Sequence, residues 1–421
     1  MASLLIEGGR ALSGRVAVEG NKNSALPLIA ACMLTDEECE ISNVPRIRDV
    51  DVLLQLIQGL GARVEGQGTG TLRIRCERVT GDQPDPALVG RLRGSVLLLG
   101  PLLARMGSAR LAPPGGDFPA RRTISTHVGA LMALGARPLD EPGHAMHAPN
   151  GLRGASFYLD EASVTGTETA LLAAAAAEGE SEIRHAATEP HVVELCIFLQ
   201  AMGVGIEGVG SSTLRVHPVA SRTGARHRLA GDYIEAGSWA VVAAITNGDI
   251  EVTGARSVDL EVIAAPLLRM GLDCSYGDDT LIVRPSTLHG VRRITTGLWP
   301  GFPSDLVSLV TVLATQAEGR TLVHDWLYEL RLFALEQMSA MRADLFLCDP
   351  HRIIVSGPAK LRGRALDSRD LRSGMALIAA ALAAEGESTV TPLETVERGY
   401  ASLIERLRSL GGQVERVEGS S

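Results

Sequence analysis

The chain has 421 residues, of which 45% are hydrophobic and 3% are aromatic, and its formal net charge at pH 7 is −9. This length exceeds what one hydrophobic core usually supports, so two domains are expected. The acidic balance and the few aromatic side chains exclude a surface that wraps a nucleic acid, although basic residues can still gather around a small anionic substrate.

The cysteines and the apolar runs indicate the compartment. The six cysteines are scattered without a CxxC pair or a metal-ligand spacing, which is typical of reduced cysteines. The first residues lack the long apolar segment of a secretory signal, and apolar runs such as 170–177 are too short to span a bilayer. We therefore expect a cytoplasmic protein with no metal, no organic cofactor, no membrane contact, no nucleic acid and no obligate protein partner.

One sequence element recurs six times along the chain. It is an apolar residue, a Gly or Arg, a small or apolar residue and a strand-like run, and its second position falls at Gly61, Gly135, Gly203, Gly271, Arg342 and Gly411. A second element keeps the same period of about 70 residues, at Gly107, Gly179, Gly248, Gly319 and Gly386. Each of these glycines follows a stretch of helical length and precedes an alternating run, so it predicts a helix stop before a strand. Six units of two helices and several short strands predict two domains of three units.

The N-terminal segment repeats a sequence from near the other end of the chain. Residues 6–15 match residues 355–364, five repeats later. The first strand is therefore expected to complete the last repeat, which makes 1–20 with 231–421 one domain and 21–230 the other. Two chain crossings between domains permit hinge closure around a cleft.

Polar residues recur just before the first, nearly all-apolar helix of each unit. They are Lys22 with Asn23, Arg93, Thr165, Glu235, Asp305 and Arg372. Helix N-termini attract anions, so the set predicts a basic site in an acidic protein. Ordinary capping is the alternative for any single member, and most of all for Thr165 and Glu235. Lys22 and Arg372 are stronger indications of an anion site, because a cation at a helix N-terminus needs an anion to offset its charge.

These residues, in this order, resemble a known enzyme family. The matching stretches are 20–31, 43–65, 92–105, 113–122, 188–195, 302–306, 328–331, 370–377 and 397–400. They are similar to the UDP-N-acetylglucosamine enolpyruvyl transferase family and, more distantly, to 5-enolpyruvylshikimate-3-phosphate synthase. The resemblance covers essentially the whole chain. It implies an α/β fold of two inside-out α/β barrels, each of three repeats, with the active site in the cleft between the domains.

The resemblance also implies a reaction, the transfer of the enolpyruvyl group of phosphoenolpyruvate to UDP-N-acetylglucosamine for peptidoglycan precursors. The phosphoenolpyruvate site would be formed by Lys22, Arg93, Arg122, Arg331, Asp370, Arg372 and Arg398. The uridine-nucleotide acceptor would be bound by Asn23, Arg122, Thr123, Ile124, Ser125, Thr126, Ser163, Val164, Thr165, Asp305 and Leu327. The catalytic residues would be Asp117, Asp305, Lys22 and Arg398, with Asp305 accepting the proton of the attacking hydroxyl.

Two departures from the family pattern leave alternatives open. Asp117 stands where the family commonly has a loop cysteine, which implies an aspartic general acid of raised pKa and resistance to fosfomycin; a solvated turn residue is the alternative. Residues 123–127 read TISTH where the family usually has Pro-x-Asp-x-His, and 163–167 and 329–332 differ as well. The acceptor can therefore be another compound, such as the 3′-hydroxyl of UMP in nucleoside-antibiotic biosynthesis or, less favoured, shikimate 3-phosphate. A non-catalytic nucleotide-binding paralogue is the remaining alternative.

Overall fold

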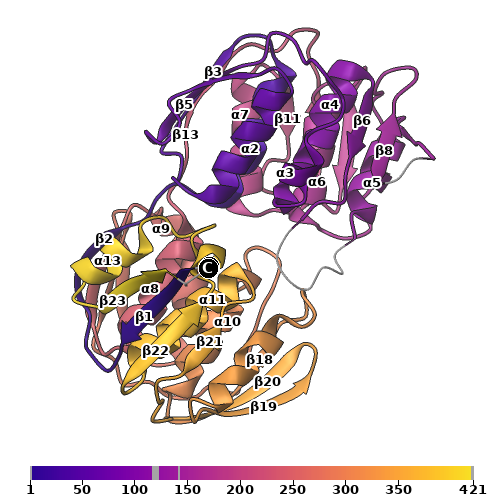
Figure 1. The fold of residues 1–421 in the computed structure, drawn as a ribbon. Helices are drawn as coiled ribbons and strands as arrows, with labels where there is room; N and C mark the ends of the chain where they lie inside the picture. The colour runs from indigo at the N-terminus through magenta and orange to yellow at the C-terminus, as the bar shows by residue number, and fades with distance from the viewer. Residues whose placement is uncertain (1, 116–122, 141–142, 419–421) are drawn as a thin grey trace. The chain divides into compact units, whose positions relative to one another are not determined.

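The computed structural model describes residues 2–115, 123–140 and 143–418. The described residues form two compact units (Figure 1). Unit one comprises the described parts of 1–19 and 231–421, and unit two those of 20–116 and 120–230. In the described part of the chain, no helix is both long and apolar enough to cross a membrane.

Unit one contains three four-stranded sheets among its described residues, with the strand orders β21-β22-β1-β23, β15-β16-β14-β2 and β17-β18-β20-β19. The strands are β1 (Ala2–Glu7), β2 (Ser13–Ala17), β14 (Asp249–Thr253), β15 (Asp273–Gly277), β16 (Thr280–Arg284), β17 (Arg293–Thr295), β18 (Gly319–His324), β19 (Asp344–Asp349), β20 (Arg352–Gly357), β21 (Ala365–Asp367), β22 (Glu387–Thr391) and β23 (Gln413–Glu418). The helices are α8 (Tyr233–Ile245), α9 (Ser257–Arg269), η3 (Ser304–Leu306), α10 (Val307–Thr315), η4 (Arg331–Ser339), α11 (Leu371–Ala383), α12 (Leu393–Val396) and α13 (Leu403–Ser409).

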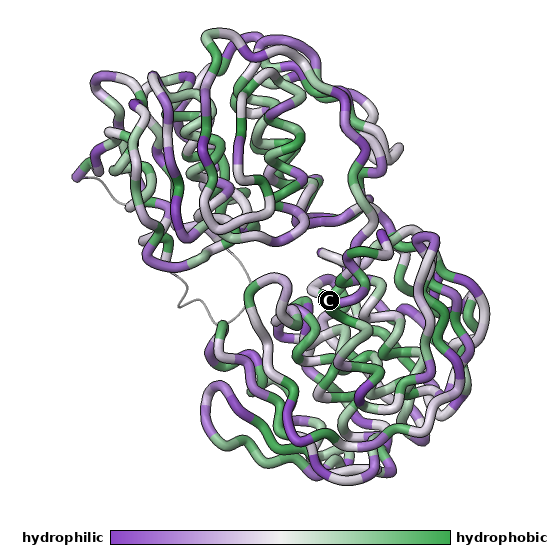
Figure 2. Tube along the Cα trace, turned by 180° about the vertical axis from the view of Figure 1, so that it is seen from behind, coloured by the Kyte–Doolittle hydropathy of each residue, from purple (hydrophilic) through white to green (hydrophobic). Residues whose placement is uncertain are grey.

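The core of unit one lies around helices rather than inside a closed sheet. Every residue of α8 and α10 is buried, and so is nearly all of α11. These three helices pack against one another, and the sheets cover their outer sides. Figure 2 shows the same helices as mostly hydrophobic. A helix that is apolar all round must be buried on every side, and this accounts for the inside-out arrangement that the resemblance implied.

Unit two repeats this plan with the described sheets β13-β3-β5-β4, β11-β12-β10-β9 and β6-β8-β7. Its strands are β3 (Glu38–Ser42), β4 (Arg63–Glu65), β5 (Thr71–Arg75), β6 (Ser108–Leu111), β7 (Arg137–Pro138), β8 (His144–His147), β9 (Ser156–Tyr158), β10 (Ser181–Arg184), β11 (Gly205–Glu207), β12 (Thr213–His217) and β13 (Arg226–Arg228). Its helices are α1 (Lys22–Ala31), η1 (Cys32–Leu34), α2 (Arg48–Gly59), α3 (Pro86–Val89), η2 (Arg93–Leu98), α4 (Leu99–Met106), α5 (Ser125–Ala133), α6 (Val164–Ala174) and α7 (Pro190–Ala201).

The second residue of the first recurring element has a left-handed backbone conformation in all six repeats. The φ angle at this position is 104° at Gly61, 95° at Gly135, 95° at Gly203, 86° at Gly271, 75° at Arg342 and 92° at Gly411. Each follows a helix or 3₁₀ helix by at most three residues and precedes a strand. A left-handed residue ends a helix and turns the chain, which explains why glycine dominates this position. Arg342 takes the same left-handed conformation without the conformational freedom of glycine.

The N-terminal strand takes the place predicted for it in the last repeat. β1 runs antiparallel to both β22 and β23, with Leu4 opposite Val390 and Arg416. It occupies the position that β20 holds in the β17-β18-β20-β19 sheet. β2 then pairs in parallel with β14, so the first 17 residues join two sheets of unit one.

The polar residues of the repeat register lie one step further into the helices than expected. The sequence placed them before each helix, but Lys22, Thr165, Glu235 and Arg372 lie in the first turn. The N-cap positions are taken by Asn21, Ser163, Asp232 and Asp370, whose side chains accept backbone N–H groups of that turn. Such short polar side chains satisfy the otherwise unpaired N–H groups, and this is why the helices begin there.

Candidate functional site

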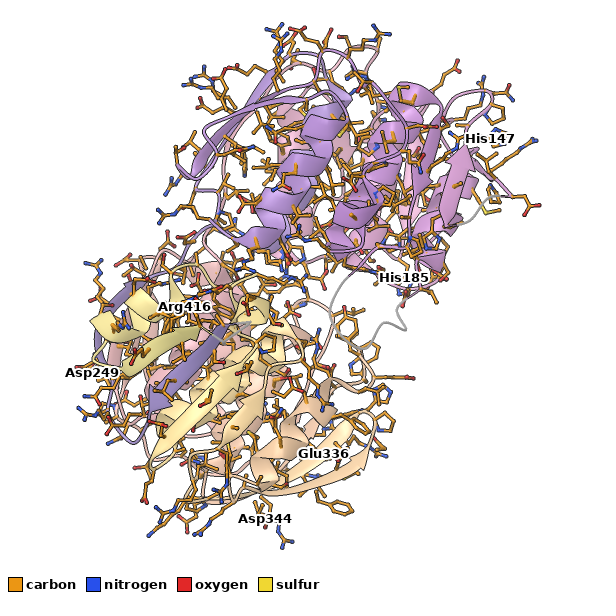
Figure 3. The ribbon with its side chains drawn as sticks, in the orientation of Figure 1. His147, His185, Asp249, Glu336, Asp344 and Arg416 are labelled. Atoms are coloured by element: carbon orange, nitrogen blue, oxygen red, sulfur yellow. The ribbon has the colours of Figure 1, made fainter. Side chains whose placement is uncertain are left out.

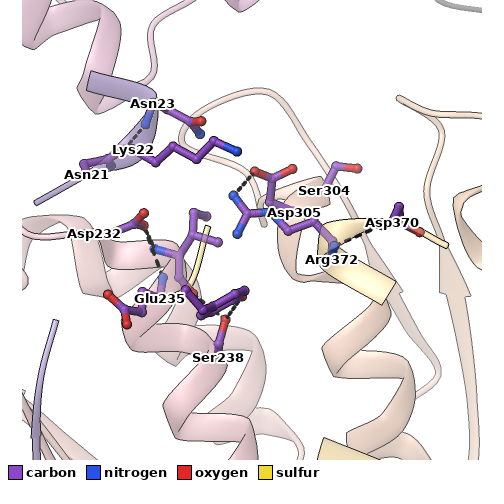
Figure 4. A network of polar contacts seen from close by, with 12 residues as sticks. Asn21, Lys22, Asn23, Asp232, Glu235, Ser238, Ser304, Asp305, Asp370 and Arg372 are labelled. Atoms are coloured by element: carbon purple, nitrogen blue, oxygen red, sulfur yellow. Dashed lines mark hydrogen bonds and ion pairs between the residues drawn. The ribbon is translucent and has the colours of Figure 1, made fainter. Parts of the chain in front are cut away.

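Asp305 is the centre of an ion-pair cluster in unit one (Figure 4). Its carboxylate accepts a hydrogen bond of 2.8 Å from Nη2 of Arg372 and one of 3.3 Å from Nη1 of Arg331. The side chains of Arg372 and Arg331 are 8% and 12% exposed, and that of Asp305 is 26% exposed. Two nearly buried guanidinium groups therefore share one carboxylate that still reaches solvent.

Each of these residues comes from the start of a helix, which brings distant segments together. Asp305 lies in η3, directly before the buried helix α10. Arg331 opens η4, and Arg372 lies in the first turn of α11 behind the N-cap residue Asp370. Asp370 accepts the backbone N–H of Arg372 at 2.9 Å. The carboxylate of Asp370 thus fixes the helix start.

A buried carboxylate that was not predicted orders this cluster. Asp325 is 0% exposed and accepts hydrogen bonds from Oγ of Ser304 at 2.7 Å and from Oγ1 of Thr296 at 2.8 Å. Ser304 also accepts a hydrogen bond of 2.7 Å from Arg331. The backbone N–H of Leu327 donates to Asp325 at 3.3 Å. Leu327 is therefore placed by the same carboxylate, through its backbone.

The electrostatics keep both guanidinium groups charged. Burial lowers the pKa of Arg372, but the neighbouring carboxylate of Asp305 outweighs burial, so its pKa is raised above the ordinary value. The pKa of Arg331 is raised in the same way, by Asp305 and Asp325 against burial. Tyr400 is hydrogen-bonded to Ser238 at 2.7 Å, and its own pKa is raised by burial. The cluster is thus a preformed set of cations suited to a phosphate or a carboxylate.

Arg398 is the remaining predicted cation of unit one. It lies half-buried after the short helix α12, two residues before the buried Tyr400. The structure therefore places Arg398, Tyr400 and Arg372 in one part of the fold, since the side chain of Tyr400 is hydrogen-bonded to that of Arg372.

In unit two, Lys22 is held by a carboxylate that was not predicted either. Nζ of Lys22 lies 2.6 Å from Oδ2 of Asp49, and the two side chains are 12% and 5% exposed. Asp49 lies in the first turn of α2. Asn23 is fixed through its backbone, whose N–H donates to the cap Asn21 at 2.8 Å. The anion that offsets the charge of Lys22 at the helix start is thus supplied by the protein itself.

The predicted acceptor residues of unit two gather at the starts of α5 and α6. Arg93 donates from Nη2 to the carbonyl of Thr123 at 2.8 Å, and the hydroxyl of Thr123 lies 2.9 Å from that of Ser125. Ile124 is the residue before α5. Arg93 therefore contacts the predicted acceptor segment.

A histidine connects the two helix starts. Nε2 of His127, on α5, lies 2.8 Å from Oγ1 of Thr165, on α6. Thr126 donates to Asp160 at 2.5 Å, and Ser163 caps α6, in which Val164 is the first residue. Burial, followed by the charge of Arg93, lowers the pKa of His127 to about 4. His127 is therefore neutral at physiological pH and serves as a hydrogen-bonding link.

Two predicted residues, Asp117 and Arg122, lie outside the described residues. The segment before them is held by Gly115, whose N–H donates to the carbonyl of Val89 at 2.9 Å. A Cβ atom at this glycine would lie 2.0 Å from the carbonyl oxygen of Gly90, so the close approach requires glycine. Within the described residues, no group of three His, Cys, Asp or Glu side chains could hold a metal ion.

The geometry agrees with the comparison to known protein families. Residues 6–407 match the family model described as EPSP synthase (3-phosphoshikimate 1-carboxyvinyltransferase). The chain therefore belongs to this family, and it is an enolpyruvyl transferase with the inside-out α/β fold.

Comparison with individual proteins indicates which enolpyruvyl transferases this chain is similar to. The chain is 44% identical to the UDP-N-acetylglucosamine 1-carboxyvinyltransferase of Bradyrhizobium diazoefficiens, over 98% of this chain and 97% of that one. It is 41% identical to the enzyme of the same name from Treponema denticola, over 99% of this chain and 100% of that one. Among solved structures, the enolpyruvyl transferase NikO from Streptomyces tendae has a TM-score of 0.89 at 26% identity and covers 100% of this chain and 99% of its own. EPSP synthase from Acinetobacter baumannii, at 20% identity and a TM-score of 0.78 over 99% of this chain and 100% of its own, shares the fold.

Proposed function

We propose that this enolpyruvyl transferase uses UDP-N-acetylglucosamine as its acceptor, in the synthesis of peptidoglycan precursors. The supporting observation is the similarity, at 37–44% identity and nearly full length, to proteins named UDP-N-acetylglucosamine 1-carboxyvinyltransferase. A cytoplasmic location is part of this proposal, and six free cysteines support it.

The cation set supports the binding of phosphoenolpyruvate, which carries a phosphate and a carboxylate. In unit one, Arg331 and Arg372 are nearly buried and charged, and Arg398 lies near them in the fold. In unit two, Lys22 is held at the start of α1. We assign the binding of the phosphoenolpyruvate anion to these residues together with Arg93 and Arg122, and the ordering of the α11 start to Asp370.

The acceptor is assigned to the polar segments of unit two. Asn23, the stretch 123–126 and the stretch 163–165 supply backbone and hydroxyl groups at helix starts, where a nucleotide phosphate is favoured. Leu327, whose backbone is ordered by Asp325, contributes an apolar contact. This set contains the residues that depart from the usual family pattern.

The reaction divides into addition and elimination. Asp305, which is paired with two guanidinium groups, accepts the proton of the acceptor hydroxyl as the oxygen of that hydroxyl forms a bond to C2 of phosphoenolpyruvate. At the same time C3 gains a proton from a general acid, which we assign to Asp117, and a tetrahedral intermediate results. The methyl group then returns a proton, the C2–O bond to phosphate breaks, and the enol ether and inorganic phosphate leave. Lys22 and Arg398 stabilise the charge on the departing phosphate.

The test is phosphate release from phosphoenolpyruvate with UDP-N-acetylglucosamine, UMP or shikimate 3-phosphate as the acceptor, with the product identified by mass spectrometry. We expect turnover with the first. Turnover with UMP alone would assign a new acceptor to the altered 123–126 segment. Absence of turnover with all three would overturn the proposal and favour a binding paralogue.

The assignment of Asp117 has its own matched pair of variants. Asp117→Ala should lose most of the activity, whereas Asp117→Cys should retain turnover and become sensitive to fosfomycin, which alkylates a thiol. The wild-type enzyme should resist fosfomycin. Full activity of Asp117→Ala would show that Asp117 is not the general acid.

A further inference from the structure

The outer face of the β17-β18-β20-β19 sheet carries an apolar row. Arg293 lies opposite Leu322, Leu322 opposite Ile354, and Ile354 opposite Phe346. Leu322 and Ile354 are each flanked in sequence by buried residues that face the core, whereas they themselves are only half-buried. Phe346 is 66% exposed. Because side chains alternate along a strand, these three residues point away from the core.

The other repeats serve as internal controls, and none of them has an apolar residue at the position of Leu322. The corresponding residues are Glu40, Arg110, Glu182, Glu251 and Thr389. The four charged ones each make an ion pair on the sheet or beside it, with Arg73, Asp82, Arg215 and Arg15 respectively. A solvent-facing sheet of this fold therefore normally pairs charges, and the fifth repeat of the chain replaces that pairing with exposed apolar surface.

An arginine pocket adjoins this row. A cavity of about 390 Å³ is lined by Arg269, Arg292, Arg293 and Leu322. Arg269 is the last residue of α9, and Arg293 begins β17, the edge strand of the sheet. Among the described residues, the three guanidinium groups have neither a hydrogen-bond partner nor an ion-pair partner. Three unpaired cations thus converge in a protein whose net charge is −9.

This surface is separate from the candidate site of the same unit. The residues around Asp305 lie at the starts of the inner helices, whereas the arginine pocket lies on the outer face of a sheet. Figure 3 labels Asp344, at the start of the edge strand β19, which forms the far side of this sheet. None of the pocket residues belongs to the predicted set for phosphoenolpyruvate or its acceptor.

We propose that the pocket and the row bind a small amphipathic anion, with a phosphate or carboxylate head among Arg269, Arg292 and Arg293 and an apolar body along Leu322, Ile354 and Phe346. The volume is within the range of small-molecule sites. Two strand-to-strand steps of about 4.8 Å separate Leu322 from Phe346, so the apolar row is roughly 10 Å long, the reach of a medium-length alkyl chain. The arginines recognise the anion by charge and by their planar donors.

The probe is octyl phosphate, titrated below its micelle concentration by calorimetry. Methyl phosphate tests the head alone, and we expect it to bind at least about tenfold more weakly, since each buried methylene contributes about 0.8 kcal/mol. The double variant Arg269→Glu/Arg293→Glu should weaken octyl phosphate binding at least about thirtyfold. Leu322→Glu, which restores the residue type of the Glu251 repeat, should weaken it about tenfold.

The matched control is Arg226→Glu, because Arg226 takes the position of Arg293 on the edge strand β13 of unit two. It should leave octyl phosphate binding unchanged. Phosphate release from phosphoenolpyruvate should also keep its wild-type rate in the double variant, which separates this site from the catalytic one. Circular dichroism melting checks that each variant is folded, and Leu322→Ser replaces Leu322→Glu if the latter is not.

Three results would overturn the proposal. Octyl phosphate binding that is unchanged in the double variant would place the ligand elsewhere, for instance on the catalytic arginines. Equal loss in Arg226→Glu would show nonspecific attraction. Sedimentation with phosphatidylglycerol vesicles through Arg269 and Arg293, without binding of free octyl phosphate, would indicate a membrane surface instead of a small-molecule site.

Discussion

Removing the carboxylate of Asp305 should affect both stability and catalysis, and the two effects can be separated. Asp305→Ala leaves Arg331 and Arg372, 12% and 8% exposed, without their shared anion. Breaking a buried ion pair by removing one partner costs about 3–5 kcal/mol. Asp305 is itself 26% exposed, and Arg331 keeps its hydrogen bond to Ser304, so we expect a loss of about 2–3 kcal/mol in unfolding free energy.

The same variant should lose most of its turnover. A general base typically contributes about 10²–10⁴ in rate, so phosphate release should fall by that factor in Asp305→Ala and in the isosteric Asp305→Asn. Stability is measured by urea denaturation and turnover by phosphate release. The control is Asp367→Ala, which removes a pair with Arg369 that is exposed on both sides and should change stability by less than about 0.5 kcal/mol.

Inorganic phosphate distinguishes electrostatic loss from general damage. If two unpaired guanidinium groups cause the instability of Asp305→Ala, millimolar phosphate should stabilise this variant more than the wild type, because the anion binds only the folded cluster. Unchanged stability of Asp305→Ala without phosphate, or equal stabilisation of both proteins by phosphate, would refute the reasoning.

Three further predictions concern single residues. Because the pKa of His127 is lowered to about 4, the folded protein resists protonation that the unfolded chain accepts near pH 6.5. The free energy of unfolding therefore decreases as pH falls from about 6.5 towards 4, by about 2 kcal/mol at pH 5. His127→Asn should remove this part of the pH dependence, which is measured by urea denaturation at a series of pH values. Arg342→Gly relieves a left-handed residue and should raise the melting temperature, with a gain of up to about 1 kcal/mol, whereas Gly411→Ala at the equivalent position should lower it. Asp49→Asn leaves Lys22 without its charged partner and should cost about 3 kcal/mol in urea denaturation; an unchanged midpoint would show that the pair contributes nothing.

The division into repeats follows from the sequence because it rests on local rules. The second recurring element predicted a helix end before a strand, and each of its five glycines lies between a helix and a strand or opens the strand. All of them except Gly248 have a left-handed φ. The first recurring element was not given this role, yet its six residues, Arg342 included, all have a left-handed φ shortly after a helix. The first helix of each unit is nearly all-apolar in sequence, and α8 and α10 are buried on every side for that reason.

The pairing of charges was decided only by the tertiary structure. The sequence indicated that Lys22 and Arg372 require an anion, but Asp49 and Asp305 supply it from other helices, 27 and 67 residues away. Asp325 belonged to none of the matching stretches, and its role depends on complete burial beside Ser304. Backbone conformation and periodicity are set by neighbours in sequence, whereas ion pairs depend on which helix starts are packed together, and that follows only from the folded core.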